Sequence, residues 1–149
     1  MSKSPTATHS NARVTFSNPD GVAAPEGHYS HAARPAANTE LLFISGQVAR
    51  GLVGNTVGIG DMRAQAEQVF KNLQQILHAH GASFADAIKA TIYVTDIAQA
   101  HLLKQVREQY YGTTKPASTL VAVTALGNPD WLLEIELIAA VPRIGELVQ

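Results

Sequence analysis

The chain has 149 residues, 46% of them hydrophobic, with a formal net charge of −1 and no cysteine. This length and composition are typical of one globular domain, and the lack of cysteine excludes disulfides and thiolate chemistry. The lysines and arginines are scattered, which argues against a nucleic-acid partner. Without a signal peptide or a long apolar run, the sequence predicts a cytoplasmic protein that does not bind membranes.

The N-terminal third of the sequence predicts a tail followed by strands. Residues 1–12 are polar and without pattern, so we expect a flexible N-terminal tail and one domain over residues 13–149. Period-two alternation and short apolar runs, bounded by turn residues, favour strands. The three predicted strands span residues 13–17, 29–34 and 41–45. The last is apolar up to its final residue, which is typical of a strand covered on both faces.

The clearest pattern in the chain is a helix between Asp61, a good N-cap, and Gly81, a good stop signal. Eight side chains fall on one helical stripe and are expected to face the core. They are Met62, Ala66, Val69, Phe70, Leu73, Ile76, Leu77 and His80. Apolar and polar residues then alternate over 88–95, which predicts a strand.

The C-terminal third predicts a second helix and two strands. Asp96 is placed to cap the helix, whose inward side chains are expected to be Leu102, Leu103, Val106 and Tyr110. The strands span residues 120–125 and 132–140. The order β-β-β-α-β-α-β-β indicates a single-domain α+β fold, a mixed sheet with two helices on one face. Several strands are apolar on both faces, so the uncovered face predicts self-association.

No metal site or cofactor is expected. His28 and His31 are three residues apart on a predicted strand, so they point to opposite faces. His78 and His80 lie roughly 200° apart around a helix. A chain without cysteine and without an i,i+4 histidine pair lacks the usual ligand patterns for zinc. Ser45 is not flanked by the glycines of a nucleophile elbow, so a Ser-His-Asp triad is not indicated either.

Four short segments carry a recognisable pattern, Gly27–Ala32, Phe43–Gln47, Lys115–Val121 and Leu133–Ala139. Together they resemble the signature of the Rid family, the reactive intermediate deaminases, also called RidA or YjgF proteins. The resemblance covers nearly the whole chain after residue 12. It implies a chorismate-mutase-like fold and a homotrimer whose sheets form a central barrel, with the helices outside and clefts for small molecules between subunits.

The resemblance also implies the residues of a site. Glu134 matches the family's glutamate that activates the attacking water, a general-base role that needs a carboxylate near the reacting carbon. Glu136 lies on the same strand face and matches no site position, so we expect a solvated carboxylate there. The residues that would bind the substrate in the cleft are Tyr29, Ser45, Gly46, Ser118 and Thr119.

Ser118 is where the chain departs from the family. Members that deaminate imines carry an arginine at this position, which clamps the substrate carboxylate with a bidentate, charge-assisted pair. A serine hydroxyl is short and neutral. We therefore expect weak or absent deamination of 2-aminoacrylate, and an imine or enamine substrate without the usual α-carboxylate. Lys104 could supply a charge from elsewhere, although a solvated helix lysine is the simpler interpretation.

Three functions follow from this pattern. The first is an imine or enamine hydrolase in which Glu134 activates water, and the presence of this glutamate favours it. The second is a protein of the same fold that binds or scavenges a small metabolite without turnover, and the loss of the arginine favours it. The third is RNA cleavage, which the scattered basic residues make the weakest of the three.

Overall fold

The structure is a computed structural model that describes residues 7–145. Its strands are β1 (Ala7–Ser10), β2 (Val14–Ser17), β3 (Ala32–Pro35), β4 (Thr39–Gln47), β5 (Ala87–Val94), β6 (Ala117–Ala122) and β7 (Leu133–Pro142). The helices are α1 (Met62–Ala79) and α2 (Leu103–Tyr111), with short 3-10 helices at Phe84–Asp86 and Ile97–Leu102. In the described part of the chain, no helix has both the length and the apolar character needed to cross a membrane.

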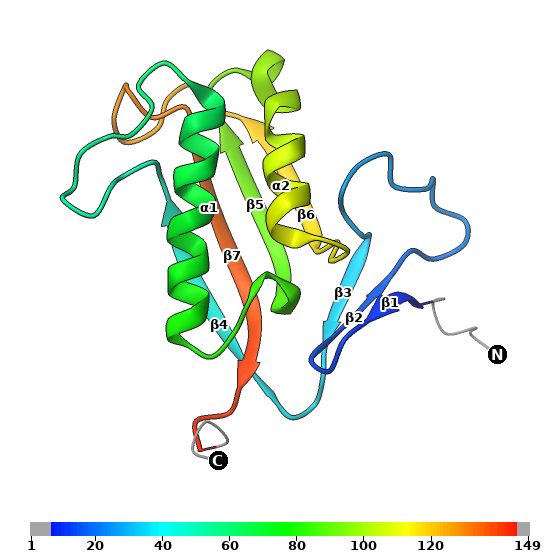
Figure 1. The fold of residues 1–149 in the computed structure, drawn as a ribbon. Coiled ribbons are helices and arrows are strands. Elements are labelled where there is room, and N and C mark those ends of the chain that lie inside the picture. Colours follow the sequence, from blue (N-terminus) through cyan, green and yellow to red (C-terminus); the bar gives the residue numbers. More distant parts are fainter. Residues whose placement is uncertain (1–6, 146–149) are drawn as a thin grey trace.

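The strands form two sheets. The larger has the order β4-β7-β5-β6, in which β5 and β6 are parallel and the other pairs antiparallel. The smaller is the antiparallel sheet β1-β2-β3. Both helices cover one face of the larger sheet (Figure 1). The predicted α+β class, with a mixed sheet and two helices on one face, is therefore confirmed.

Helix α1 begins and ends where its sequence signals predict. The Asp61 carboxylate accepts a hydrogen bond from the backbone N–H of Ala64 at 3.0 Å, and Gly81 follows the helix with a positive φ of 67°. The stripe from Met62 to Leu77 packs into the main core between helices and sheet. His80 is an exception, because it lies past the end of α1 and is exposed.

The second predicted helix is divided. Asp96 caps a 3-10 helix, and the α-helical turns of α2 start only at Leu103. The tighter 3-10 spacing rotates the side chains relative to a continuous α-helix. The prediction of an inward Leu102 is therefore wrong, since its side chain is 38% exposed. Tyr111 is buried in the core, whereas Tyr110 only packs against it.

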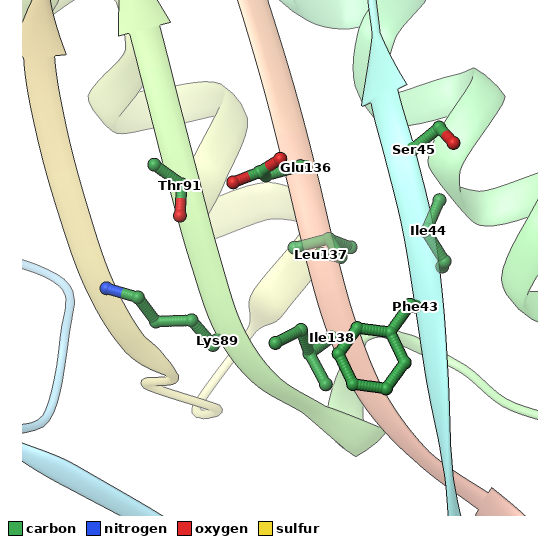
Figure 2. Close-up of a pocket in the computed structure, with 8 residues that line it drawn as sticks. All are labelled: Phe43, Ile44, Ser45, Lys89, Thr91, Glu136, Leu137 and Ile138. Carbon is green, nitrogen blue, oxygen red and sulfur yellow. The ribbon is translucent and has the colours of Figure 1, made fainter.

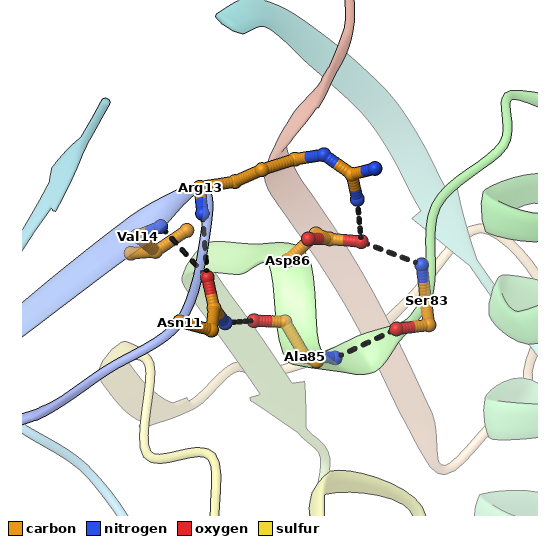
Figure 3. A network of polar contacts seen from close by, with 6 residues as sticks. All are labelled: Asn11, Arg13, Val14, Ser83, Ala85 and Asp86. Atoms are coloured by element: carbon orange, nitrogen blue, oxygen red, sulfur yellow. Dashed lines mark hydrogen bonds and ion pairs between the residues drawn. The ribbon is translucent and has the colours of Figure 1, made fainter. Parts of the chain in front are cut away.

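Strand β1 lies inside the segment that the sequence suggests is a tail. Residues 7–10 pair antiparallel with β2, so the tail prediction is wrong for them, and residues 1–6 lie outside the described part of the chain. At the turn between β1 and β2, the Asn11 Oδ1 accepts hydrogen bonds from the backbone N–H groups of Arg13 and Val14, and its Nδ2 donates to the carbonyl oxygen of Ala85 (Figure 3). The Arg13 guanidinium pairs with the Asp86 carboxylate at 2.9 Å. This contact ties the small sheet to the turn before β5.

The small sheet packs against the larger one through a second apolar cluster, made by Val14, Phe16, Ile88 and Ala140. The cluster covers only one end of the sheet face that the helices leave open. Elsewhere on that face β4 exposes large apolar side chains: Leu41 is 51% and Phe43 is 71% exposed. Within one copy of the chain this face of β4 is therefore uncovered, and its coverage by a second copy stays a prediction.

Candidate functional site

The two glutamates of β7 lie on the face of the large sheet that carries no helix. Leu133, Ile135 and Leu137 are buried under the helices, so the residues between them point the other way. Glu134 is half-buried there and Glu136 is exposed. The predicted shared face of the two carboxylates follows directly from this alternation.

The start of β7 is fixed by Gln65 of α1, a fully buried amide. Its Oε1 accepts a hydrogen bond from the backbone N–H of Leu132 at 2.9 Å, and its Nε2 donates to the carbonyl oxygen of Asp130 at 2.7 Å. Buried amides are costly unless they are satisfied, so this contact holds the strand in one register. Glu134 is two residues beyond the anchored N–H.

A bulge in β4 lies beside the glutamates. Ile44 pairs with Leu137 and Gln47 with Ile135, so two residues of β4, Ser45 and Gly46, oppose the single residue Glu136. Such a bulge bends the strand and redirects its side chains, and bulges are frequent next to active sites. The sequence pattern Ser-Gly-Gln is thus the end of a strand that changes register at the candidate site.

Gly46 makes room for the carboxylate of Glu134. A Cβ atom at position 46 would lie 2.0 Å from Oε1 of Glu134 and 2.8 Å from its Cδ. No other residue type leaves the carboxylate where it is, because every other side chain begins with that Cβ. The structure therefore brings Glu134 and Gly46 together, as the resemblance implies, although it does not test their function.

A groove of about 260 Å³ runs over the same sheet face, between β4, β7 and β5 (Figure 2). Its lining residues are Phe43, Ile44, Ser45, Lys89, Thr91, Glu136, Leu137 and Ile138. Thr119 adjoins it, because its hydroxyl accepts a hydrogen bond from Nζ of Lys89. Glu136 lines the groove and accepts a hydrogen bond from the Tyr93 hydroxyl at 3.2 Å. Sequence reasoning assigned Glu136 no such position.

Ser118 lies on the opposite face of the sheet from Glu134. It pairs with Ala90 of β5, whereas Thr119 pairs with Thr91. Ala90 is buried under the helices, so Ser118 faces α2 and Thr119 faces the groove. The structure therefore brings Ser45, Gly46, Thr119 and Glu134 to one face, and it leaves Ser118 on the other.

Tyr29 lies at neither of these two faces and lines a separate cavity. It belongs to the connection between β2 and β3, and its ring meets that of His31 edge-on with 6.1 Å between the ring centroids. Together with Gly27, Thr113 and Lys115, among others, it lines a cavity of about 510 Å³. Glu134 is not part of that cavity. One copy of the chain does not assemble all the residues that the sequence predicts for the site.

The main residue that sequence reasoning missed is Arg107 of α2. Its Nη2 donates to the backbone carbonyl of His28 at 2.9 Å and, more weakly, to the Ser118 hydroxyl at 3.4 Å. Burial lowers the pKa of Arg107, yet an arginine remains charged in proteins. One turn before and after it, Leu103 and Tyr111 are buried. This spacing of four was a usable signal for an inward-facing arginine.

His28 lines the same pocket as Arg107. Its Nε2 lies 2.8 Å from the carbonyl oxygen of Thr114, which fits an N–H donor at that atom. Burial lowers the pKa of His28 and the hydrogen bond to Thr114 opposes this, while the nearby charges of Arg107 and Lys115 lower it further. The predicted alternative cation, Lys104, lines the same pocket as Arg107 and His28 and is exposed.

No group of three histidine, aspartate or glutamate side chains within residues 7–145 is arranged to hold a metal ion. The carboxylate of Glu134 lies beside a groove on one face of the sheet, and the half-buried guanidinium of Arg107 lies next to the neutral hydroxyl of Ser118 on the other.

Comparison with known proteins adds a family context. Residues 21–141 match the family model described as endoribonuclease L-PSP. A RutC family protein of Pyrococcus horikoshii is 39% identical over 115 residues, which cover 77% of this chain and 88% of the relative. A crystal structure from the conserved Rid protein family of Yersinia pestis superimposes with a TM-score of 0.79 at 31% identity, covering 87% of this chain and 99% of that one. A 2-iminobutanoate/2-iminopropanoate deaminase of Dermatophagoides farinae is 28% identical, covering 78% of this chain and 88% of the relative.

Proposed function

Because this chain belongs to the endoribonuclease L-PSP family, which includes Rid and RutC proteins, we propose that it is a small-molecule hydrolase that deaminates an imine or enamine. The observation that carries the proposal is the Glu134 carboxylate, which lies over Gly46 on the sheet face without helices, beside the groove. The name of the mite relative, a 2-iminobutanoate/2-iminopropanoate deaminase, agrees with this reaction.

In the proposed reaction Glu134 acts as general base and then as general acid. Its carboxylate takes a proton from a water molecule while the water oxygen bonds to the imine carbon. The electron pair of the C=N double bond moves to nitrogen, and Glu134 delivers to that nitrogen the proton it took from water, which gives a carbinolamine. The carbinolamine then collapses: Glu134 takes the proton of its hydroxyl as the C=O double bond forms, the C–N bond breaks, and Glu134 gives that proton to the departing nitrogen, which leaves as ammonia. The products are a carbonyl compound and ammonia.

We further propose that the working cleft forms between copies of the chain in a homotrimer. Two observations support this. Phe43 and Leu41 are exposed on the uncovered face at 71% and 51%, which is unusual for large apolar side chains on a sheet. In addition, Ser118 and Glu134 lie on opposite faces of one sheet, so a cleft that uses both needs a second copy.

The substituent carried by the imine depends on the region around Ser118. Because a serine is neutral, the sequence predicts a substrate without an α-carboxylate. The sequence offered only Lys104 as a possible replacement for a cation at position 118. In the structure, Arg107 donates a hydrogen bond to Ser118, so a guanidinium lies at the position where a substrate carboxylate would need a positive charge.

The experiment that tests the proposed reaction uses imines generated in situ. A dehydratase releases 2-aminoacrylate, an amino-acid oxidase supplies longer 2-imino acids, and an amine oxidase supplies imines that lack a carboxylate. Ammonia release is followed with and without the protein. We expect acceleration by the wild type, a loss of about 10²- to 10⁴-fold in Glu134→Gln, and a much smaller loss in the matched variant Glu136→Gln. Equal losses would remove Glu134 from the mechanism. Ligand binding without any acceleration would favour a non-catalytic binding protein.

A further inference from the structure

Arg107 is a charged side chain that is half-buried and forms no ion pair with an acidic residue in the described part of the chain. Its Nε is buried and has no hydrogen-bond partner there. A buried charge of this kind is costly unless an opposite charge compensates it. The guanidinium lacks a directly paired anion within the described part of one copy, although Glu26 and Glu108 line the same pocket.

A second observation points to the same place. The hydroxyl of Tyr111 is buried and unpartnered in the described part of the chain, and the residue as a whole is only 4% exposed. Tyr111 stands one helical turn after Arg107, and its ring lies near that of His28, with 6.0 Å between the centroids. In native proteins, buried hydroxyl groups almost always have a hydrogen-bond partner. Two unsatisfied donors thus lie on one turn of α2.

The same turn borders a pocket of about 420 Å³, large enough for a small metabolite. Its lining residues are Glu26, Gly27, His28, Ala100, Lys104, Arg107, Glu108 and Lys115. Lys104, Arg107 and Lys115 are the cationic side chains of this lining, and Glu26 and Glu108 are its carboxylates. Of the three cations, Arg107 is the least exposed. The guanidinium offers planar, paired donors, which match a carboxylate better than an ammonium group does.

We propose that Arg107 binds the carboxylate of the substrate, in place of a cation at position 118. This inference rests on the proposed deaminase function and names its substrate class, the small 2-imino acids and their 2-oxo acid products. Arg107 reaches Ser118 from the neighbouring helix, so the short hydroxyl leaves space for the guanidinium of α2. Because Arg107 and Glu134 lie on opposite faces of the sheet, the two residues that act on one ligand come from neighbouring copies.

The competing explanation is that Arg107 only holds the loop at His28, through its hydrogen bond to that carbonyl. A structural role predicts that Arg107→Gln lowers the thermal stability and leaves ligand affinity unchanged. A binding role predicts that Arg107→Gln weakens ligand affinity and changes the thermal stability little. The two roles therefore separate in a direct binding measurement on the intact protein.

The test is calorimetry with 2-oxobutyrate, and with its uncharged amide as second probe. Loss of charged hydrogen bonds predicts that Arg107→Gln weakens 2-oxobutyrate binding roughly 10- to 100-fold and leaves binding of the amide nearly unchanged. Arg63→Gln, in an exposed arginine of α1 that pairs with Glu67, is the matched control and should bind as the wild type does. The double variant Arg107→Gln/Ser118→Arg should recover affinity, because position 118 lies within 3.4 Å of Nη2 of Arg107.

Three results would overturn the inference. The first is that the wild type does not bind 2-oxobutyrate at about 10 mM, a concentration well above usual metabolite dissociation constants. The second is that Arg107→Gln leaves the affinity for 2-oxobutyrate unchanged. The third is that Lys104→Gln weakens this affinity more than Arg107→Gln does. Turnover is not needed for this test. If the wild type binds 2-oxobutyrate through Arg107 but hydrolyses no imine, the proposed reaction fails and the inference holds. If it hydrolyses imines and Arg107→Gln changes neither affinity nor KM, the inference fails alone.

Discussion

The strands of the large sheet supply two faces that are built in opposite ways. Toward α1 and α2, β7 presents Leu133, Ile135 and Leu137, all at most 1% exposed. On the other face the same strand presents Glu134 and Glu136, next to the exposed Phe43 of β4. The helix-covered face contains most of the apolar contacts that stabilise the fold. The open face contributes less to the stability of a single copy, so it is free to carry polar groups and to meet another copy.

The largest expected effect is on the covered face. Phe70 is fully buried, and its ring packs with those of Phe84, Tyr110 and Tyr111 at centroid distances of 5.2–5.7 Å. Phe70→Ala should lower the free energy of unfolding by about 3–5 kcal/mol, through lost burial and the cavity that remains. Urea unfolding measures it. A loss below about 1 kcal/mol would mean that this face is not the core.

On the open face the expected effect is on assembly and not on the fold. Phe43→Asp places a charge where we propose that copies meet, and desolvating it there is unfavourable. Light scattering should give three times the chain mass of 15.9 kDa for the wild type and a lower mass for the variant, with an unchanged circular dichroism spectrum. A wild-type mass of one chain at micromolar concentration would contradict the trimer.

A smaller effect is expected at Gly46. An alanine Cβ would overlap Oε1 of Glu134, so the carboxylate must move. The backbone of Gly46 is not among the positive-φ positions, so the alanine adds no backbone strain. Gly46→Ala should reduce imine hydrolysis about 10-fold, as positional errors in catalytic groups do, with a change in stability below about 1 kcal/mol.

A double-mutant cycle checks the reason for that effect. In the Glu134→Gln background, Gly46→Ala should add little further loss of activity, since the displaced group no longer acts as a base. Full additivity of the two losses would show that Gly46 acts through something other than Glu134.

The sequence predicted the covered face well and the open face only in part. Helix α1 follows from local signals, because Asp61, Gly81 and the stripe between them are read within one segment. Alternation along β7 likewise predicts that Glu134 and Glu136 share a face. Strand β1 could not be predicted this way, since residues 7–10 are held by pairing with β2 and not by a pattern of their own.

Position 118 shows the same limit at the site. The sequence gives its residue type, but the face that it occupies follows from the register of β6 against β5, where Ser118 pairs with Ala90. The sequence interval of 11 residues between Arg107 and Ser118 gives no hint of their contact. Tertiary packing of α2 on the sheet creates this contact, so it cannot be read from the sequence of either segment.

The smallest expected effect concerns His28 and pH. Burial lowers its pKa below the ordinary value of 6.5, so the unfolded chain takes up the proton first as the pH falls. The stability contributed by neutral His28 is present above pH 6.5 and is lost as the pH falls from there through the lower pKa of the folded state. Urea midpoints at pH 7.5 and 5.5 should therefore fall more for the wild type than for His28→Gln. Equal falls would contradict a half-buried His28 that is neutral in the folded protein.

The most direct test of the account is whether the two faces work together across copies. Glu134→Gln and Arg107→Gln are each expected to be weakly active alone. When the two variants are co-expressed in equal amounts, they assort at random into closed rings of three. Roughly a quarter of the sites then combine an intact Arg107 from one copy with an intact Glu134 from the next. Imine hydrolysis should recover to about that fraction of the wild-type value. Activity no higher than the average of the two separate variants would contradict a site shared between copies.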